Sequence, residues 1–164
     1  MIYLGVFATA SATLILEVAL TRLFSVAFWY HFAFLVISIA LLGFGASGSF
    51  LAIFKSLLDK PYKSLSIVSI IFSFSIILVF VICRVIPFDP ARIAWDSRQI
   101  LYIFLYSFFL SIPFFFSGLI ISIAISHAPR IVNKIYFSDL AGAGLGALSV
   151  SILFLYLEGS GVIV

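Results

Sequence analysis

Residues 64–86 read SLSIVSIIFSFSIILVFVICRVI, a run in which Arg84 is the only charged side chain. A helix crosses the hydrocarbon core of a bilayer with about 20 apolar residues, whereas a strand of a membrane barrel needs only about 10 with alternating polarity. This run is continuous and long enough for a helix. We therefore predict that it spans a membrane as an α-helix.

Four further runs are also mainly apolar and long enough for a spanning helix. Ser, Gly and Ala recur within them, which suits close helix contact in lipid, where packing and hydrogen bonds replace the hydrophobic driving force. The expected fold class is all-α, a polytopic integral membrane bundle of about five transmembrane helices in one domain, without a soluble domain. The predicted spans are residues 2–20, 32–54, 64–86, 99–126 and 140–157.

The composition of the whole chain excludes several other classes of protein. Of its 164 residues, 65% are hydrophobic and 9% are charged, against about 25% charged in soluble domains. Such a chain cannot cover itself with a polar surface, so a soluble enzyme is nearly excluded. The net charge of +3 is spread over separate loops, and we expect no nucleic-acid partner. The single cysteine, Cys83, allows neither a disulfide framework nor a cysteine metal site.

The connectors between the runs carry nearly all of the charge. Short loops rich in Lys and Arg favour the cytoplasmic side of a membrane. The second and fourth connectors with their flanks hold five such residues, against four on the opposite side. All four lysines belong to the first group, so we expect a multi-pass protein of the cell (inner or plasma) membrane with a cytoplasmic N-terminus. These lysines are Lys55, Lys60, Lys63 and Lys134.

Two glycine clusters resemble cofactor-binding loops. The first matches G-x-G-x-x-G, but the second strand and acidic residue of a dinucleotide-binding fold do not follow it. The second follows Asp139 as in loops that bind S-adenosyl compounds, but residues 147–157 lack the polar face of a helix on a soluble sheet. We expect no cofactor and assign both clusters to helix packing. The glycines are Gly43, Gly45, Gly48, Gly142, Gly144 and Gly146.

Glu17 is the best candidate for a functional residue, because a carboxylate inside a membrane is costly unless it is paired or protonated. Arg22 lies five residues further on, about 140° round the helix, whereas Thr21 lies at i+4 on the same side. Two interpretations stay open for this intramembrane polar site: a structural tether to a neighbouring helix, or a proton or cation pathway. We predict no catalytic residue and no metal ligand.

Pro113 interrupts the fourth run. A proline inside a helix removes one backbone hydrogen bond, here to Phe109, and should kink the helix. Ser111 and Ser117 are available to satisfy the freed groups. Such kinks line cavities in some transporters and only shape packing elsewhere.

Several segments together resemble one known family. They read LEVALTRLFS (16–25), ALLGFGASGS (40–49), PFFFSGLIIS (113–122) and YFSDLAGAGLGAL (136–148). They resemble the N-terminal membrane domain of polytopic spermidine synthase-like proteins. In that family a multi-spanning region, sometimes likened to half of a major facilitator, precedes an aminopropyltransferase-like Rossmann domain. The resemblance covers the membrane part alone, so it implies no catalytic residue among these 164.

Three functions follow from these observations as expectations. The first is a non-catalytic membrane module, an anchor or helper subunit whose partners are the lipid bilayer and other membrane subunits or further copies of itself. The second is a carrier fragment for a small cation such as a polyamine, although five spans without an internal repeat are few for a complete carrier. The third, implied by the resemblance, is the membrane half of a spermidine synthase-like enzyme.

Overall fold

The computed structural model describes residues 2–27, 31–89, 92 and 95–161, and this part of the chain is almost entirely α-helical. Its five long helices are each long and apolar enough to cross a membrane. The prediction of an all-α bundle with five spans is therefore confirmed. The elements are α1 (Ile2–Ala27), α2 (His31–Ile53), η1 (Lys55–Leu58), α3 (Pro61–Val85), α4 (Arg98–His127), η3 (Pro129–Ile131) and α5 (Val132–Gly161).

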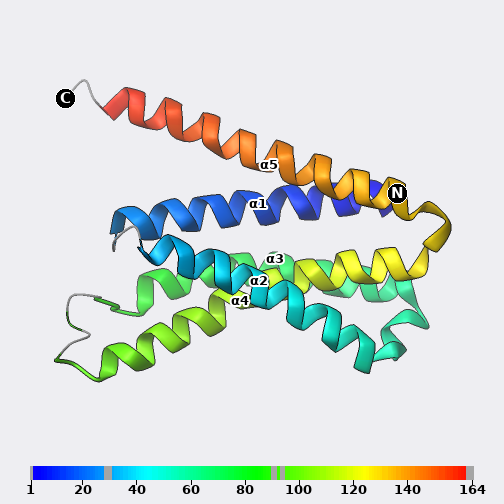
Figure 1. Ribbon diagram of the computed structural model, residues 1–164, viewed down its shortest axis with the longest axis horizontal. Coiled ribbons are helices and arrows are strands. Elements are labelled where there is room, and N and C mark those ends of the chain that lie inside the picture. Colours follow the sequence, from blue (N-terminus) through cyan, green and yellow to red (C-terminus); the bar gives the residue numbers. More distant parts are fainter. Residues whose placement is uncertain (1, 28–30, 90–91, 93–94, 162–164) are drawn as a thin grey trace.

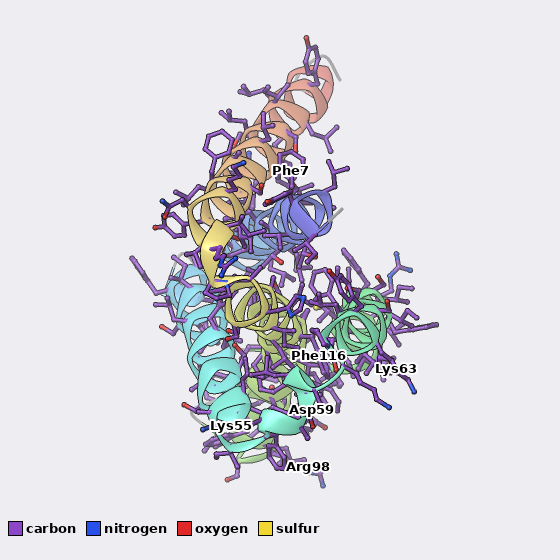
Figure 2. The ribbon with its side chains drawn as sticks, turned by 90° about the vertical axis from the view of Figure 1, so that its right-hand side faces the viewer. Phe7, Lys55, Asp59, Lys63, Arg98 and Phe116 are labelled. Atoms are coloured by element: carbon purple, nitrogen blue, oxygen red, sulfur yellow. The ribbon has the colours of Figure 1, made fainter. Side chains whose placement is uncertain are left out.

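The helices run up and down in succession, so that α5 lies beside α1 and points in the same direction (Figure 1). The N-terminus and the connectors α2–α3 and α4–α5 share one end of the bundle, and the C-terminal part of α5 lies at the other (Figure 1). Seen from the first end, α5 lies outside α1, and α1 rests on a group formed by α2, α3 and α4 (Figure 2). The first and last helices thus form a pair on one side of the bundle.

The helices extend beyond several of the predicted spans. α1 continues from Leu20 to Ala27, and α5 begins at Val132, two turns before Leu140. Hydropathy falls where polar residues enter, but helical hydrogen bonding continues until a residue breaks it. Proline supplies such breaks at both ends of α3. Pro61 occupies its first turn, and Ile86, the residue before Pro87, turns to an extended conformation.

The core lies around α4, which is the most buried of the five helices. Leu110, Phe114 and Ile123 on this helix have no exposed surface. α2 and α4 cross at Gly43, where an added β-carbon would lie 2.8 Å from Cβ of Phe114 and 2.9 Å from the carbonyl oxygen of Ser111. The absence of a side chain at Gly43 therefore lets the two backbones approach closely.

α1 and α5 are held together by a second set of close backbone contacts. A β-carbon at Gly142 would collide with the backbone carbonyl of Phe7, and one at Gly146 would lie 2.9 Å from Cα of Ser11. Ser11 Oγ donates a hydrogen bond of 2.8 Å to the carbonyl oxygen of Gly142. Since both glycines and both α1 residues are four apart, the two helices pack in parallel with a constant register.

Candidate functional site

Four polar side chains follow one another along α1 at intervals of four residues: Thr9, Thr13, Glu17 and Thr21. Each step of four turns the position about 40° further round an α-helix. The line therefore moves gradually from the side of α1 that packs on the bundle toward its edge. Accordingly, Thr9 and Thr13 are buried, whereas Glu17 and Thr21 are half-buried. We call these four residues the α1 polar line.

The buried half of the α1 polar line is joined to α4 by a hydrogen bond between two hydroxyls. Thr13 Oγ1 and Ser117 Oγ lie 2.7 Å apart, and both residues are almost completely buried. Thr13 Oγ1 also lies 2.7 Å from the carbonyl oxygen of Thr9 and donates to it. A hydroxyl has one proton, so Ser117 is the donor in the bond to Thr13. This contact satisfies both hydroxyls inside the bundle.

The three residues of the predicted intramembrane polar site, Glu17, Thr21 and Arg22, do not form one cluster. Arg22 turns toward α5, where its Cζ lies 4.6 Å from the ring centre of Phe154, a cation–π contact. Within the described residues, no ion pair joins Glu17 to Arg22 and no hydrogen bond joins Glu17 to Thr21. Glu17 is thus near Thr21 along the helix, whereas the charge of Arg22 is directed to another helix.

The six glycines assigned to helix packing fall into two sets. Gly43, Gly142 and Gly146 are buried, and each has the backbone of another helix close to the position of a β-carbon. The other three are exposed, and no described atom lies within 4 Å of a β-carbon placed there; these are Gly45, Gly48 and Gly144. The first set packs helices within the chain, and the second set lies on the outer faces of α2 and α5.

Pro113 lies inside α4 and is almost completely buried. The first and second halves of α4 take different directions (Figure 1), and Pro113 lies at the middle of the range Arg98–His127. Ser111 Oγ donates to the carbonyl oxygen of Phe108 at 2.7 Å. The hydroxyl of Ser117 is hydrogen-bonded to Thr13 of α1 and, among the described residues, not to the backbone of α4. The bend lies where α4 crosses α2, and it brings Gly118 against Phe44 of that helix.

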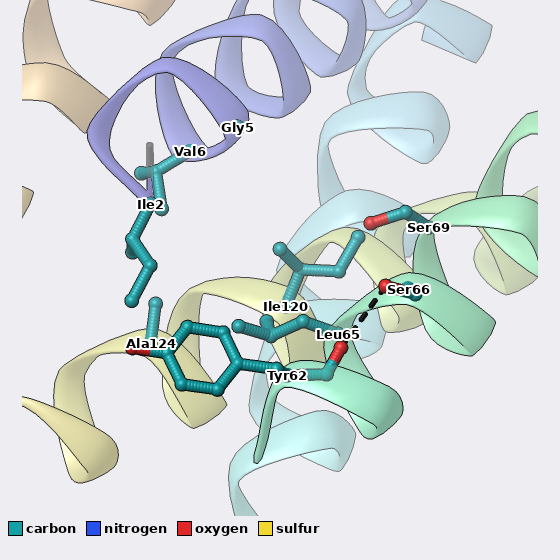
Figure 3. A pocket seen from close by; sticks show the side chains of 9 residues that line it. All are labelled: Ile2, Gly5, Val6, Tyr62, Leu65, Ser66, Ser69, Ile120 and Ala124. Carbon is teal, nitrogen blue, oxygen red and sulfur yellow. Dashed lines mark hydrogen bonds between the residues drawn. The ribbon is translucent and has the colours of Figure 1, made fainter.

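A cavity of about 350 Å³ opens between α1, α3 and α4 near the N-terminal end of the bundle (Figure 3). Its walls are mainly apolar, and its polar side chains include Tyr62 and Ser66. Ser66 Oγ donates to the carbonyl oxygen of Tyr62 at 3.0 Å, so this hydroxyl is already bonded within α3 (Figure 3). A cavity of this kind suits acyl chains or apolar side chains rather than a polar substrate.

Two parts of this arrangement were not anticipated from the sequence. The contact between Thr13 and Ser117 joins residues 104 positions apart, and the contact of Ser11 with Gly142 joins residues 131 apart. The spacing of Thr9, Thr13, Glu17 and Thr21 was a usable signal for the α1 polar line. Nothing in the sequence of α1 indicates which distant hydroxyl faces it.

Comparison with protein families, with curated proteins and with solved structures finds no match to this chain. Among the described residues, no group of three or more His, Cys, Asp or Glu side chains is placed to hold a metal ion.

Proposed function

We propose that this protein is a non-catalytic integral membrane subunit, an anchor or helper that packs against other membrane helices. The outward glycines Gly45, Gly48 and Gly144 carry the proposal. In lipid, small residues are concentrated where helices touch, because they allow close backbone approach. Their buried counterparts in the same clusters, Gly43 and Gly142, have this role within the chain. The same feature on an outer face suits a helix from another chain.

The position of α5 supports the same proposal. This helix packs chiefly on α1, and only 17% of its apolar span is buried. Its outer face combines Gly144 with large exposed side chains, among them Leu148 at 60% and Leu155 at 72% exposure. A glycine flanked by bulky residues forms a notch that a partner helix can enter.

Loss of assembly is the test of this function. Gly144→Leu should leave the isolated chain folded, because no described atom lies within 4 Å of the added β-carbon. It should reduce the fraction of protein in larger complexes, after gentle solubilisation of native membranes, by about fivefold, as expected for roughly 1 kcal/mol of lost packing. Ile70→Phe, on the 58% exposed outer side of α3, is the matched control. Equal complex fractions for wild type and Gly144→Leu would refute the proposal.

We further propose that the N-terminus faces the cytoplasm of a cell (inner or plasma) membrane. The end of the bundle that holds the N-terminus also holds η1, where Lys55, Asp59 and Lys63 surround the connector (Figure 2). Lys60, Arg130 and Lys134 lie in the connectors or first turns at this same end. The proposal therefore rests on five basic residues and the positive-inside rule.

Cysteine labelling measures this orientation. In a Cys83→Ser background, an impermeant thiol reagent added to intact cells should modify Arg92→Cys and spare Lys60→Cys. Disruption of the membrane should make both positions reactive. Labelling of position 60 alone in intact cells would mean that the orientation is the reverse.

A further inference from the structure

Glu17 lies close to the middle of its membrane span. The apolar span of α1 covers Ile2–Val26, and Glu17 is three residues past its central position. At about 1.5 Å per residue, this is about 4.5 Å along the helix from the centre. The hydrocarbon core extends about 15 Å to either side of its midplane. Glu17 is thus placed at the depth where an ionised side chain is most costly.

The register between α1 and α5 places a second half-buried carboxylate, Asp139, at a different depth. Gly142 lies against Phe7, so Asp139, three residues before Gly142, is level with the first turn of α1. That turn is at the end of the span, where headgroups and water begin. Asp139 and Glu17 are both half-buried, but they differ in depth by about 20 Å, or thirteen residues of α1 at about 1.5 Å each.

No cation of the described part of the chain is placed to neutralise Glu17. Arg22 is engaged with Phe154 of α5. Residues 32–53 of α2 contain no charged side chain, and the basic residues of α3, α4 and α5 lie in the first or last turns of those helices. The hydroxyl one turn away, Thr13, is already satisfied by Ser117 and Thr9. The carboxylate of Glu17 therefore lies near the middle of the membrane at the edge of the bundle. Its side chain is half-buried, so part of it is accessible to a neighbouring helix from outside the chain.

We propose that the face of α1 carrying Glu17 and Thr21 docks a transmembrane helix of a partner protein that presents a lysine or arginine near the bilayer midplane. Charge complementarity selects this partner, because pairing with a cation removes the cost of a carboxylate in hydrocarbon. Thr21, one turn further along and also half-buried, offers a hydroxyl beside the pair. This inference rests on the proposed role as a helix-packing subunit and adds the chemistry of the partner.

The experiment uses the full chain in phosphatidylcholine vesicles with synthetic transmembrane peptides as probes. One peptide is a polyleucine helix with a single central lysine, and the other has leucine at that position. Energy transfer from a donor on Lys60→Cys, in the Cys83→Ser background, to an acceptor on the peptide measures binding. We expect the lysine peptide to bind about tenfold more tightly, the scale of one intramembrane polar pair. Equal affinities for the two peptides would overturn the proposal.

Variants identify the carboxylate responsible. Glu17→Gln keeps the shape and removes the charge, so it should abolish the preference for the lysine peptide. Asp139→Asn removes a half-buried carboxylate of α5 at a different depth and should keep the preference. A preference that persists in Glu17→Gln, or is lost in Asp139→Asn alone, would contradict the assignment to Glu17.

A measurement on the wild type covers the case in which Glu17→Gln does not fold. A photoreactive group next to the central lysine should crosslink to α1 around residues 17–21. Crosslinks confined to α3 or to the outer face of α5 would overturn the proposal. These results are separate from the assembly test with Gly144→Leu, so a failure of the proposed function and a failure of this inference can be told apart.

Discussion

Gly142→Leu should separate α5 from α1 and strongly destabilise the protein. The β-carbon of the new leucine would collide with the backbone carbonyl of Phe7 and would lie 3.0 Å from Cα of Phe7. Backbone atoms cannot rotate away as a side chain can, so the helices must move apart. The hydrogen bond from Ser11 Oγ to the carbonyl oxygen of Gly142 would be lost with this movement.

The free energy of unfolding should fall by about 1–3 kcal/mol or more, the range typical of overpacked cores. This loss would be measured as a lower Tm in detergent. Gly144→Leu is the matched control, two residues away on the same helix. No described atom lies within 4 Å of its β-carbon, and leucine is a better helix former than glycine by somewhat less than about 1 kcal/mol. Its Tm should be unchanged or higher. Similar losses in the two variants would show that α5 does not depend on the contact at Gly142.

Gly43→Leu should disrupt the crossing of α2 and α4 in the centre of the bundle. The new β-carbon would meet Cβ of Phe114 at 2.8 Å and the backbone nitrogen of Phe115 at 2.9 Å. These atoms belong to the turn that follows Pro113, and Phe114 is completely buried. Backbone atoms cannot rotate away as the end of a side chain can, so α2 and α4 must move apart to accommodate the leucine.

We expect a loss toward the upper part of the about 1–3 kcal/mol range, measured by unfolding in mixed micelles with increasing SDS. Hydrogen exchange should rise in both α2 and α4, because each helix loses its main neighbour. Gly45→Leu serves as the control, since its β-carbon position is open among the described residues. Unchanged stability of Gly43→Leu would mean that the crossing can open without cost.

The division between the two sets of glycines could not be read from the sequence. Gly142 and Gly144 are two residues apart in one motif, DLAGAGLGA, and they point to opposite sides of the same helix. In a soluble protein the polar face of a helix would indicate which glycine is buried. α5 has apolar residues on both faces, since lipid and protein neighbours are equally apolar, so this contrast is missing.

For Glu17 too, the sequence predicts one property and only the tertiary structure decides another. The sequence was sufficient to choose it as the candidate, but the predicted span, residues 2–20, places it near one end of the apolar run. The structure continues α1 to Ala27, and this extension places Glu17 close to the middle of the span. Its surroundings depend on which side of α1 packs against α4. The contact of Thr13 with Ser117 sets that rotation, and four-residue spacing then carries Glu17 to the edge of the bundle.

Helix formation and the number of spans follow from hydropathy, because lipid offers no partner to backbone N–H and C=O groups and each apolar run must satisfy them internally. The sequence of a segment such as residues 64–86 is therefore sufficient to predict that it forms a helix. The pairing of α1 with α5, the crossing at Gly43 and the position of Glu17 are different in kind. They depend on close fit between segments more than 60 residues apart in the chain. Shape complementarity of this kind exists only once the helices have been brought together.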